Sequence, residues 1–251
     1  MVLPSLSIGA AVGVILSAAF VYVEVGRYAT PQVPVTLFEE RREIFAYTAG
    51  LFVGIPFAVA YLLYALAMVN GALPGALLFL GLLVGGTELA QWALLRSAYW
   101  GRSASAPFYA LGFRASIGGI ISLAIVAQYL GGTTLQVVGV LLVLLQSVAV
   151  VGLEVTGALF SLPPGGPEGR TGGGPLRAGV FSAVGFFLLG LGPLAGEAGS
   201  FGGAALALLG ALYLYRRLRL RLSLIPAPGA GPRPEPLAES SAYGRTKGGR
   251  R

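Results

Sequence analysis

The chain has 251 residues, of which 55% are hydrophobic and 11% charged, whereas a typical soluble domain has about 45–50% and about 25%. This excess of apolar residues argues against a soluble protein, because a soluble fold could not keep so many apolar side chains away from water. The sequence contains no histidine, cysteine or aspartate, which removes the usual zinc, haem, thiol and Ser-His-Asp chemistries. We therefore expect no metal, no cofactor and no catalytic residue, and an enzyme is the less favoured class.

Long apolar stretches dominate the sequence. A membrane-spanning helix needs about 20 mostly apolar residues, because about 30 Å of hydrocarbon is crossed at about 1.5 Å per residue. Seven stretches approach this length, and the last is the weakest, with 15 residues before Arg216. We predict an all-α, polytopic integral membrane protein with seven transmembrane helices. The predicted spans are approximately residues 6–25, 44–69, 72–95, 108–130, 135–160, 178–195 and 201–215.

Short connections indicate how these spans pair. Residues 70–71, 131–132 and 196–200 are the connections after the second, fourth and sixth spans. Short connections make consecutive helices antiparallel neighbours, so the chain is predicted to form one helix followed by three hairpins. Gly9 and Gly13 have the spacing that allows two helices to pack closely. This spacing favours a retained first span over a cleaved signal peptide.

The cations lie on one side of this topology. The connections after the first, third and fifth spans, together with the C-terminal tail, carry sixteen of the seventeen Lys and Arg residues. Because Lys and Arg accumulate in cytoplasmic loops, we expect the N-terminus outside and the C-terminus in the cytoplasm. Residues 1–222 are the expected membrane domain and 223–251 a disordered basic tail. The expected location is the cell membrane, and the arginine-rich, cysteine-free composition fits a prokaryote.

A basic cluster lies next to the membrane, directly before this tail. Such clusters are attracted to anionic inner-leaflet lipids by about 1 kcal/mol per cation. We therefore expect the lipid bilayer, and these lipids in particular, as partners, and no nucleic acid. A homo-oligomer or further subunits of a membrane complex remain open as partners. The basic cluster consists of Arg216, Arg217, Arg219 and Arg221.

A second run of charges, residues 39–43, precedes the second span. Thr36 and Glu39 have the spacing of a capping box, which predicts that a helix begins near Thr36. Acidic residues in a first turn also suit the helix dipole. We interpret this run as a solvated collar at the membrane interface, with a docking surface for a cytoplasmic partner as the alternative.

Arg114 is the one cation of the sequence that falls inside a predicted span. A charge near the centre of a span costs about 2.5–3.5 kcal/mol to insert, so its position demands a reason. Counted from the cytoplasmic ends of their spans, Arg114 lies about 10 Å deep, Glu88 about 11 Å and Glu154 about 9 Å. We predict that these three residues form one buried charge cluster, with Gln91 and Ser182 as possible neighbours.

This cluster has three interpretations. With both carboxylates ionised its net charge is −1, so one Glu could hold or exchange a proton or admit a cation. A structural ion pair that joins three helices explains the same residues more simply. Separate side chains that extend to the interface are the third interpretation, although the short stem of Glu88 disfavours it.

Three functions follow from these interpretations. The first is a transporter or channel-like carrier that uses the Glu/Arg layer in the cytoplasmic half. The alternatives are a non-catalytic structural subunit of a membrane complex and a seven-helix receptor or sensor. A cavity that reaches the cluster would favour a carrier, and an exposed groove of small residues would favour a subunit. A cavity open only to the outside would favour a receptor.

Overall fold

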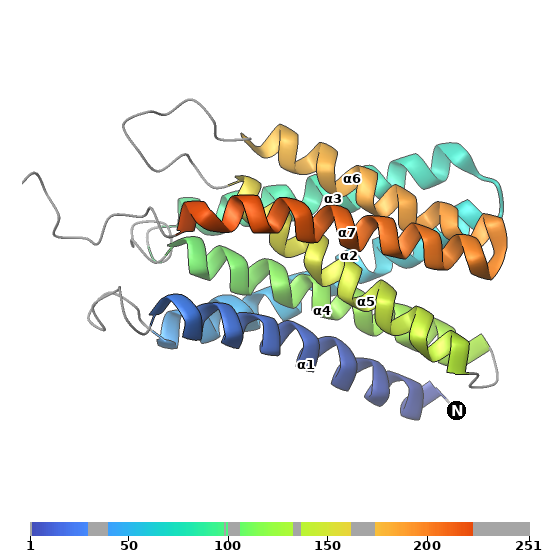
Figure 1. Ribbon diagram of the computed structural model, residues 1–251, viewed down its shortest axis with the longest axis horizontal. Helices are drawn as coiled ribbons and strands as arrows, with labels where there is room; N and C mark the ends of the chain where they lie inside the picture. Colours follow the sequence, from blue (N-terminus) through green and yellow to red (C-terminus); the bar gives the residue numbers. More distant parts are fainter. Residues whose placement is uncertain are drawn as a thin grey trace, which may run out of the picture.

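The computed structural model describes residues 2–29, 40–97, 99, 106–132, 137–161 and 174–222. This part of the chain is all-helical, as predicted, and its helices lie side by side along one long axis (Figure 1). The short 3₁₀ turn η1, Gly192–Ala195, joins the last two helices. The seven α-helices are α1 (Val2–Ala29), α2 (Glu40–Val69), α3 (Leu73–Arg96), α4 (Ala106–Gly132), α5 (Val137–Ser161), α6 (Gly174–Leu191) and α7 (Gly196–Leu222).

Five of these helices are long and apolar enough to cross a membrane, namely α2, α3, α4, α5 and α7. The apolar parts described for α1 and α6 are shorter, Ile8–Glu24 and Leu176–Leu191. The protein is therefore a helical bundle of the membrane-spanning kind, as its composition predicts.

Two helix ends differ from the prediction. Residues 196–200 were expected to form a connection, but α7 begins at Gly196 and is longer than the weak seventh span implied. Gly196 has a φ of 76° and allows the chain to reverse, and Glu197 lies in the first turn of α7, where a negative charge suits the helix dipole. In the same way, α4 continues through Gly131 and Gly132, which were expected to form a connection.

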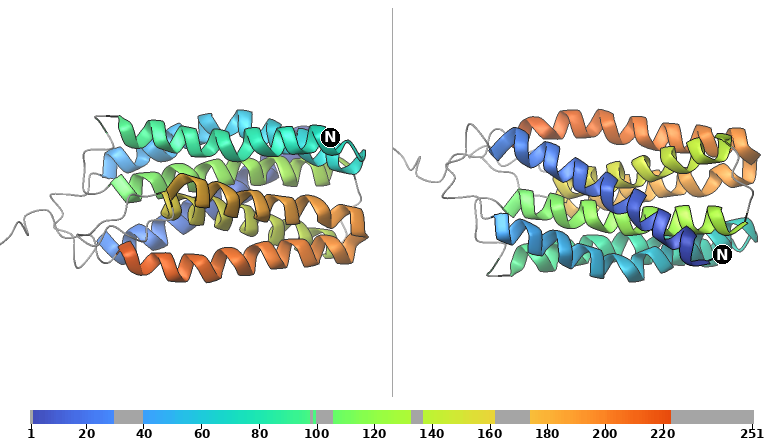
Figure 2. Two further views of the ribbon diagram at one scale, coloured as in Figure 1. Left: turned by 90° about the horizontal axis from the view of Figure 1, so that it is seen from above. Right: turned by 90° about the horizontal axis from the view of Figure 1, so that it is seen from below.

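The central element of the bundle is α4. In its apolar 18-residue segment 83% of the residues are buried, against 22–44% in the corresponding segments of the other four long helices. It packs extensively against α1, α2 and α5. Figure 2 shows α1 running obliquely across the bundle. The innermost helix is thus the one that carries Arg114.

Glycines allow the other helices to approach α4. A Cβ atom placed on Gly9 of α1 would lie 2.8 Å from the backbone oxygen of Leu123, and one on Gly13 would collide with the backbone oxygen of Gly119. A Cβ on Gly50 of α2 would collide with the backbone oxygen of Phe113. The spacing of Gly9 and Gly13 therefore does what the sequence predicts, since it lets α1 contact the backbone of another helix.

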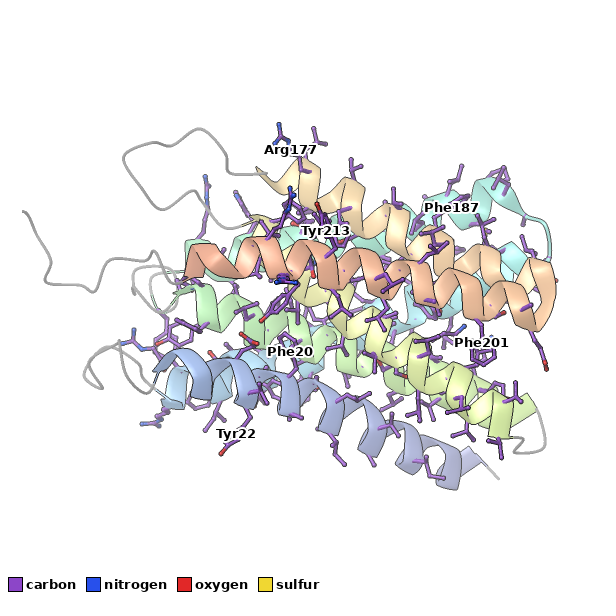
Figure 3. All side chains as sticks on the ribbon, viewed as in Figure 1. Phe20, Tyr22, Arg177, Phe187, Phe201 and Tyr213 are labelled. Atoms are coloured by element: carbon purple, nitrogen blue, oxygen red, sulfur yellow. The ribbon has the colours of Figure 1, made fainter. Side chains whose placement is uncertain are left out.

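The two ends of the bundle differ in charge. The helices alternate in direction, and we call the end where α1 begins the N-terminal end and the end where α7 finishes the C-terminal end (Figure 1). Arg177 and Tyr22 lie toward the C-terminal end, whereas Phe187 and Phe201 lie toward the opposite end (Figure 3). Apart from Arg114, the cations with described side chains begin or finish helices at the C-terminal end. They are Arg41, Arg42, Arg96, Arg177, Arg216 and Arg217.

Aromatic rings lie against the guanidinium groups of several of these arginines. The guanidinium carbon of Arg96 lies 4.2 Å from the centre of the Trp92 ring, and that of Arg42 lies 4.8 Å from the centre of the Tyr99 ring. Similar contacts join Arg41 to Phe45 and Arg217 to Tyr213. Aromatic residues beside cations are typical of helix ends at a membrane interface.

Gly13 and Gly85 provide a matched test of the packing around α4. Gly13→Ala should lower the free energy of unfolding by about 1–3 kcal/mol, because the added methyl group meets backbone atoms that cannot move aside. Gly85→Ala should be neutral or stabilising by up to about 1 kcal/mol, because nothing lies within 4 Å of the new atom. Thermal unfolding in detergent measures both. Equal effects of the two substitutions would contradict the close contact between α1 and α4.

Candidate functional site

Arg114, which is fully buried, contacts both carboxylates that the sequence placed at its depth. Its Nη1 atom donates a hydrogen bond to Oε1 of Glu88 on α3, over 3.1 Å. Its Nε atom lies 2.6 Å from Oε2 of Glu154 on α5. The Nε–H group does not point at that oxygen, so the second contact is an ion pair rather than a well-directed hydrogen bond. We call Glu88, Arg114 and Glu154 the charge cluster.

The charge cluster is closed to solvent. Arg114 and Glu154 have no exposed surface, and the side chain of Glu88 is 9% exposed. One cation and two carboxylates give a formal charge of −1 when all are ionised. Charges in such a setting are tolerable only when they are paired, because each loses its water shell. The cluster therefore fixes α3, α4 and α5 against one another.

Ser161 on α5 completes one side of the cluster, and the sequence analysis missed it. Its hydroxyl oxygen lies within hydrogen-bonding distance of Oε2 of Glu88, the oxygen that Arg114 does not use, and of the backbone oxygen of Gly157, so its single proton is donated to one of them at a time. The available signal was spacing, because Ser161 follows Glu154 by seven residues and two helical turns bring both to one face of α5.

The two predicted neighbours lie in different places. Gln91 does not bind the charge cluster, because its amide nitrogen donates over 3.1 Å to the backbone oxygen of Ala158 and so links α3 to α5. Ser182 enters from α6 and is fully buried. A Cβ atom placed on Gly157 would lie 2.7 Å from Nη2 of Arg114 and 3.1 Å from Oγ of Ser182. Gly157 thus leaves room between the serine hydroxyl and the arginine.

The region around the cluster has more polar groups than the protein satisfies. Native structures pair most buried polar atoms, and an unpaired one is costly. A group of unpaired atoms in one place is typical of a site that exchanges a proton or holds a further polar group. Among the described residues, the buried side-chain atoms here without a hydrogen-bond partner include Nη2 of Arg114, Oε1 of Glu154, Oε1 of Gln91 and Oγ of Ser182.

A cavity of about 300 Å³ lies on the other side of the core, toward the N-terminal end. Gln146 is its lining residue closest to Glu154 along α5, at eight residues or about 12 Å. Fully buried apolar side chains fill the bundle between the two levels, so the cavity does not reach the charge cluster. This apolar layer comprises Ile117, Ile121, Val150, Leu153 and Phe186.

The basic cluster is described only in part. Arg216 and Arg217 are exposed near the end of α7, and the Arg217 guanidinium lies 4.9 Å from the centre of the Tyr213 ring. The side chains of Arg219 and Arg221 lie outside the described residues. Contact of this cluster with anionic lipid stays a prediction.

The burial of Glu43 contradicts the expectation that the charged run before the second span is a solvated collar. Its side chain is only 7% exposed, and neither carboxylate oxygen has a hydrogen-bond partner among the described residues. It occupies space over Gly112 of α4, where a Cβ atom would collide with the carboxylate. Arg41, two residues earlier, is exposed as predicted, and Thr36 lies outside the described residues.

Comparison of the chain with models of known protein families, with curated proteins and with solved structures finds no match. Any function must therefore be argued from the geometry of the charge cluster and of the cavity.

Double substitutions test whether the charge cluster acts as a unit. Arg114→Leu alone should lower the free energy of unfolding by about 3–5 kcal/mol, because it leaves buried carboxylates unpaired. Adding either Glu88→Gln or Glu154→Gln to Arg114→Leu should restore part of that loss, with coupling of about 0.5–3 kcal/mol between the two sites. Denaturant titration in mixed micelles measures each variant. Strictly additive effects would contradict a common cluster.

At alkaline pH, where the Glu43 carboxyl group is ionised, Glu43→Gln should raise the free energy of unfolding by about 1–3 kcal/mol, because an unpaired buried amide costs less than an unpaired buried carboxylate. The same substitution at Glu88, whose carboxylate is paired, is the matched control and should lower it. Thermal unfolding of both variants gives the comparison. Destabilisation by Glu43→Gln would show that this carboxylate has a partner after all.

Proposed function

We propose that this protein is a multi-pass membrane carrier in which the charge cluster binds a proton and forms the barrier of the cytoplasmic half. The observation that supports this function is the set of unpaired polar atoms at the cluster, on Arg114, Glu154 and Ser182. A static ion pair is expected to satisfy the groups that it buries. The charge cluster instead leaves donors and acceptors unpaired, and a transiently bound proton or polar group can use them.

A proton fits the charge and the space of the site. The cluster needs one further positive charge to become neutral, and its closed surroundings suit a proton better than a hydrated metal ion. Protonation of Glu154 would weaken its attraction to Arg114 and so the tie between α4 and α5. Binding or release of one proton thereby changes the balance between two arrangements of these helices, as a coupled carrier requires.

The orientation follows from the cations. We propose that α1 and α6 also span the membrane, which gives seven spans, and that the arginine-rich C-terminal end faces the cytoplasm. The charge cluster then lies in the cytoplasmic half and the cavity in the outer half, separated by the apolar layer. This order, from cavity to apolar layer to paired charges, suits a carrier that is closed toward the cytoplasm.

A ligand-sensing receptor is the second candidate. The cavity favours it, because the cavity stops at the apolar layer and does not reach the charge cluster. In a receptor the charge cluster would be a permanent structural tie. The structural-subunit alternative would instead use exposed small residues such as Gly81 and Gly85 of α3, which have nothing packed within 4 Å.

Accessibility of Ser182 separates these functions. The sequence has no cysteine, so Ser182→Cys carries the sole thiol. We predict that a charged, membrane-impermeant thiol reagent labels Ser182→Cys from the side of the C-terminal tail in membrane vesicles. The labelling rate should change several-fold when a proton gradient is imposed, because protonation shifts the population that is open to that side.

Two exposed positions serve as controls for this experiment. Arg216→Cys at the C-terminal end and Glu197→Cys at the N-terminal end should each react from one side only, and they identify the two faces of the vesicle. If both controls react but Ser182→Cys stays inert from either side, the charge cluster is a static tie and the carrier is wrong. The receptor then becomes the better function.

A further inference from the structure

The cavity near the N-terminal end combines apolar walls with polar side chains that converge from different helices. Its volume of about 300 Å³ is at the small end of the range for ligand sites. Ala65 of α2, Ile125 of α4 and Leu189 of α6 contribute to the apolar walls. Tyr61 and Gln146 contribute polar groups, as does Gln128.

These three polar side chains are free to bind a ligand. Within the described part of the chain, Tyr61, Gln128 and Gln146 make no side-chain hydrogen bond. Tyr61 as a whole is only 6% exposed, and its hydroxyl makes no hydrogen bond within the described part of the chain. Each glutamine amide offers both donors and an acceptor, and the hydroxyl offers one of each.

Aromatic packing holds Tyr61 in place. Its ring centre lies 6.1 Å from that of Phe186 and 6.3 Å from that of Tyr64. The Tyr64 hydroxyl donates over 3.1 Å to the backbone oxygen of Phe186, which ties α2 to α6. The neighbouring aromatic rings therefore hold the Tyr61 hydroxyl in place, as a preformed binding site requires.

The charge of a ligand is limited by the lining. No Asp, Glu, Lys or Arg is among the described residues that line the cavity. A charged molecule would lose its water there without gaining a partner of opposite charge. A purely apolar molecule would cover the amides and the hydroxyl without bonding them, which is also unfavourable.

We propose that this cavity binds a small uncharged molecule with an apolar, ring-sized body and an amide or hydroxyl group. Gln146 and Tyr61 bond the polar group, and the walls from α2, α4 and α6 enclose the body. The inference goes beyond the proposed function, because such a site serves as the substrate site of a carrier or the ligand site of a sensor alike.

Protection of a single thiol tests the proposal with two probes of matched size, benzamide and benzoate. Ala65→Cys places the thiol in the cavity wall of the otherwise cysteine-free chain. Benzamide should slow labelling of Ala65→Cys by a small thiol reagent about tenfold at saturation, whereas benzoate should leave the rate unchanged. Glu197→Cys, which is exposed outside the cavity, is the control and should react at one rate with or without either probe.

A second variant identifies the polar contact. Adding Gln146→Leu to Ala65→Cys keeps the shape of the wall and should weaken the apparent affinity for benzamide about tenfold, the loss expected for one or two hydrogen bonds. The rate without a probe should stay the same, which shows that the variant is folded.

Three results would overturn the proposal: no protection by benzamide, equal protection by benzamide and benzoate, or protection that Gln146→Leu leaves unchanged. None of them bears on the labelling of Ser182→Cys, because that residue lies beyond the apolar layer. Failure of the ligand site and failure of the carrier are thus distinguishable.

Discussion

A fully buried guanidinium on the central helix sets the requirements for the rest of the bundle. Arg114 has no exposed surface, so its charge must be balanced by other side chains rather than by water. The balancing carboxylates, Glu88 and Glu154, come from the helices on either side of it in the chain. Their contacts fix the rotation and height of α3, α4 and α5 together. Glycines on α1 and α2 then let these helices close around α4.

Along the axis of the bundle the protein changes from polar to apolar and back to polar. The cavity with Gln146 and Tyr61 occupies one level, the apolar layer around Ile121 the next, and the charge cluster the third. A permanent structural tie explains the charge pairing, but it does not explain why Ser182 and the second oxygen of Glu154 stay without partners among the described residues. The proton exchange that we propose for the cluster would account for both observations.

The sequence predicted features that depend on distance along a helix. The common depth of Glu88, Arg114 and Glu154 followed from the rise of 1.5 Å per residue, and the structure brings the three side chains together. Features that depend on how neighbouring helices are rotated were not predictable. Ser161 bonds Glu88 and Gln91 bonds a backbone oxygen because of the register between α3 and α5.

Two segments were misjudged for different reasons. Glu43 belongs to a charged run that looks solvated, and its burial depends on the space that Gly112 leaves on another helix. Residues 196–200 are rich in small residues and looked like a connection, yet they form the first turn of α7. At Glu43 packing between helices outweighs the local preference of the sequence, whereas α7 begins where Gly196 turns the chain and Glu197 follows in the first turn.

Infrared difference spectroscopy tests proton exchange at the charge cluster most directly. Spectra of the reconstituted protein would be recorded between two pH values at which it stays folded, in the Glu43→Gln background so that this carboxyl group does not contribute. We predict a carbonyl band of a protonated carboxyl group that appears at the lower pH and is lost in Glu154→Gln or in Glu88→Gln. Spectra that neither of these two substitutions changes would contradict proton binding at the cluster and leave it a static ion pair.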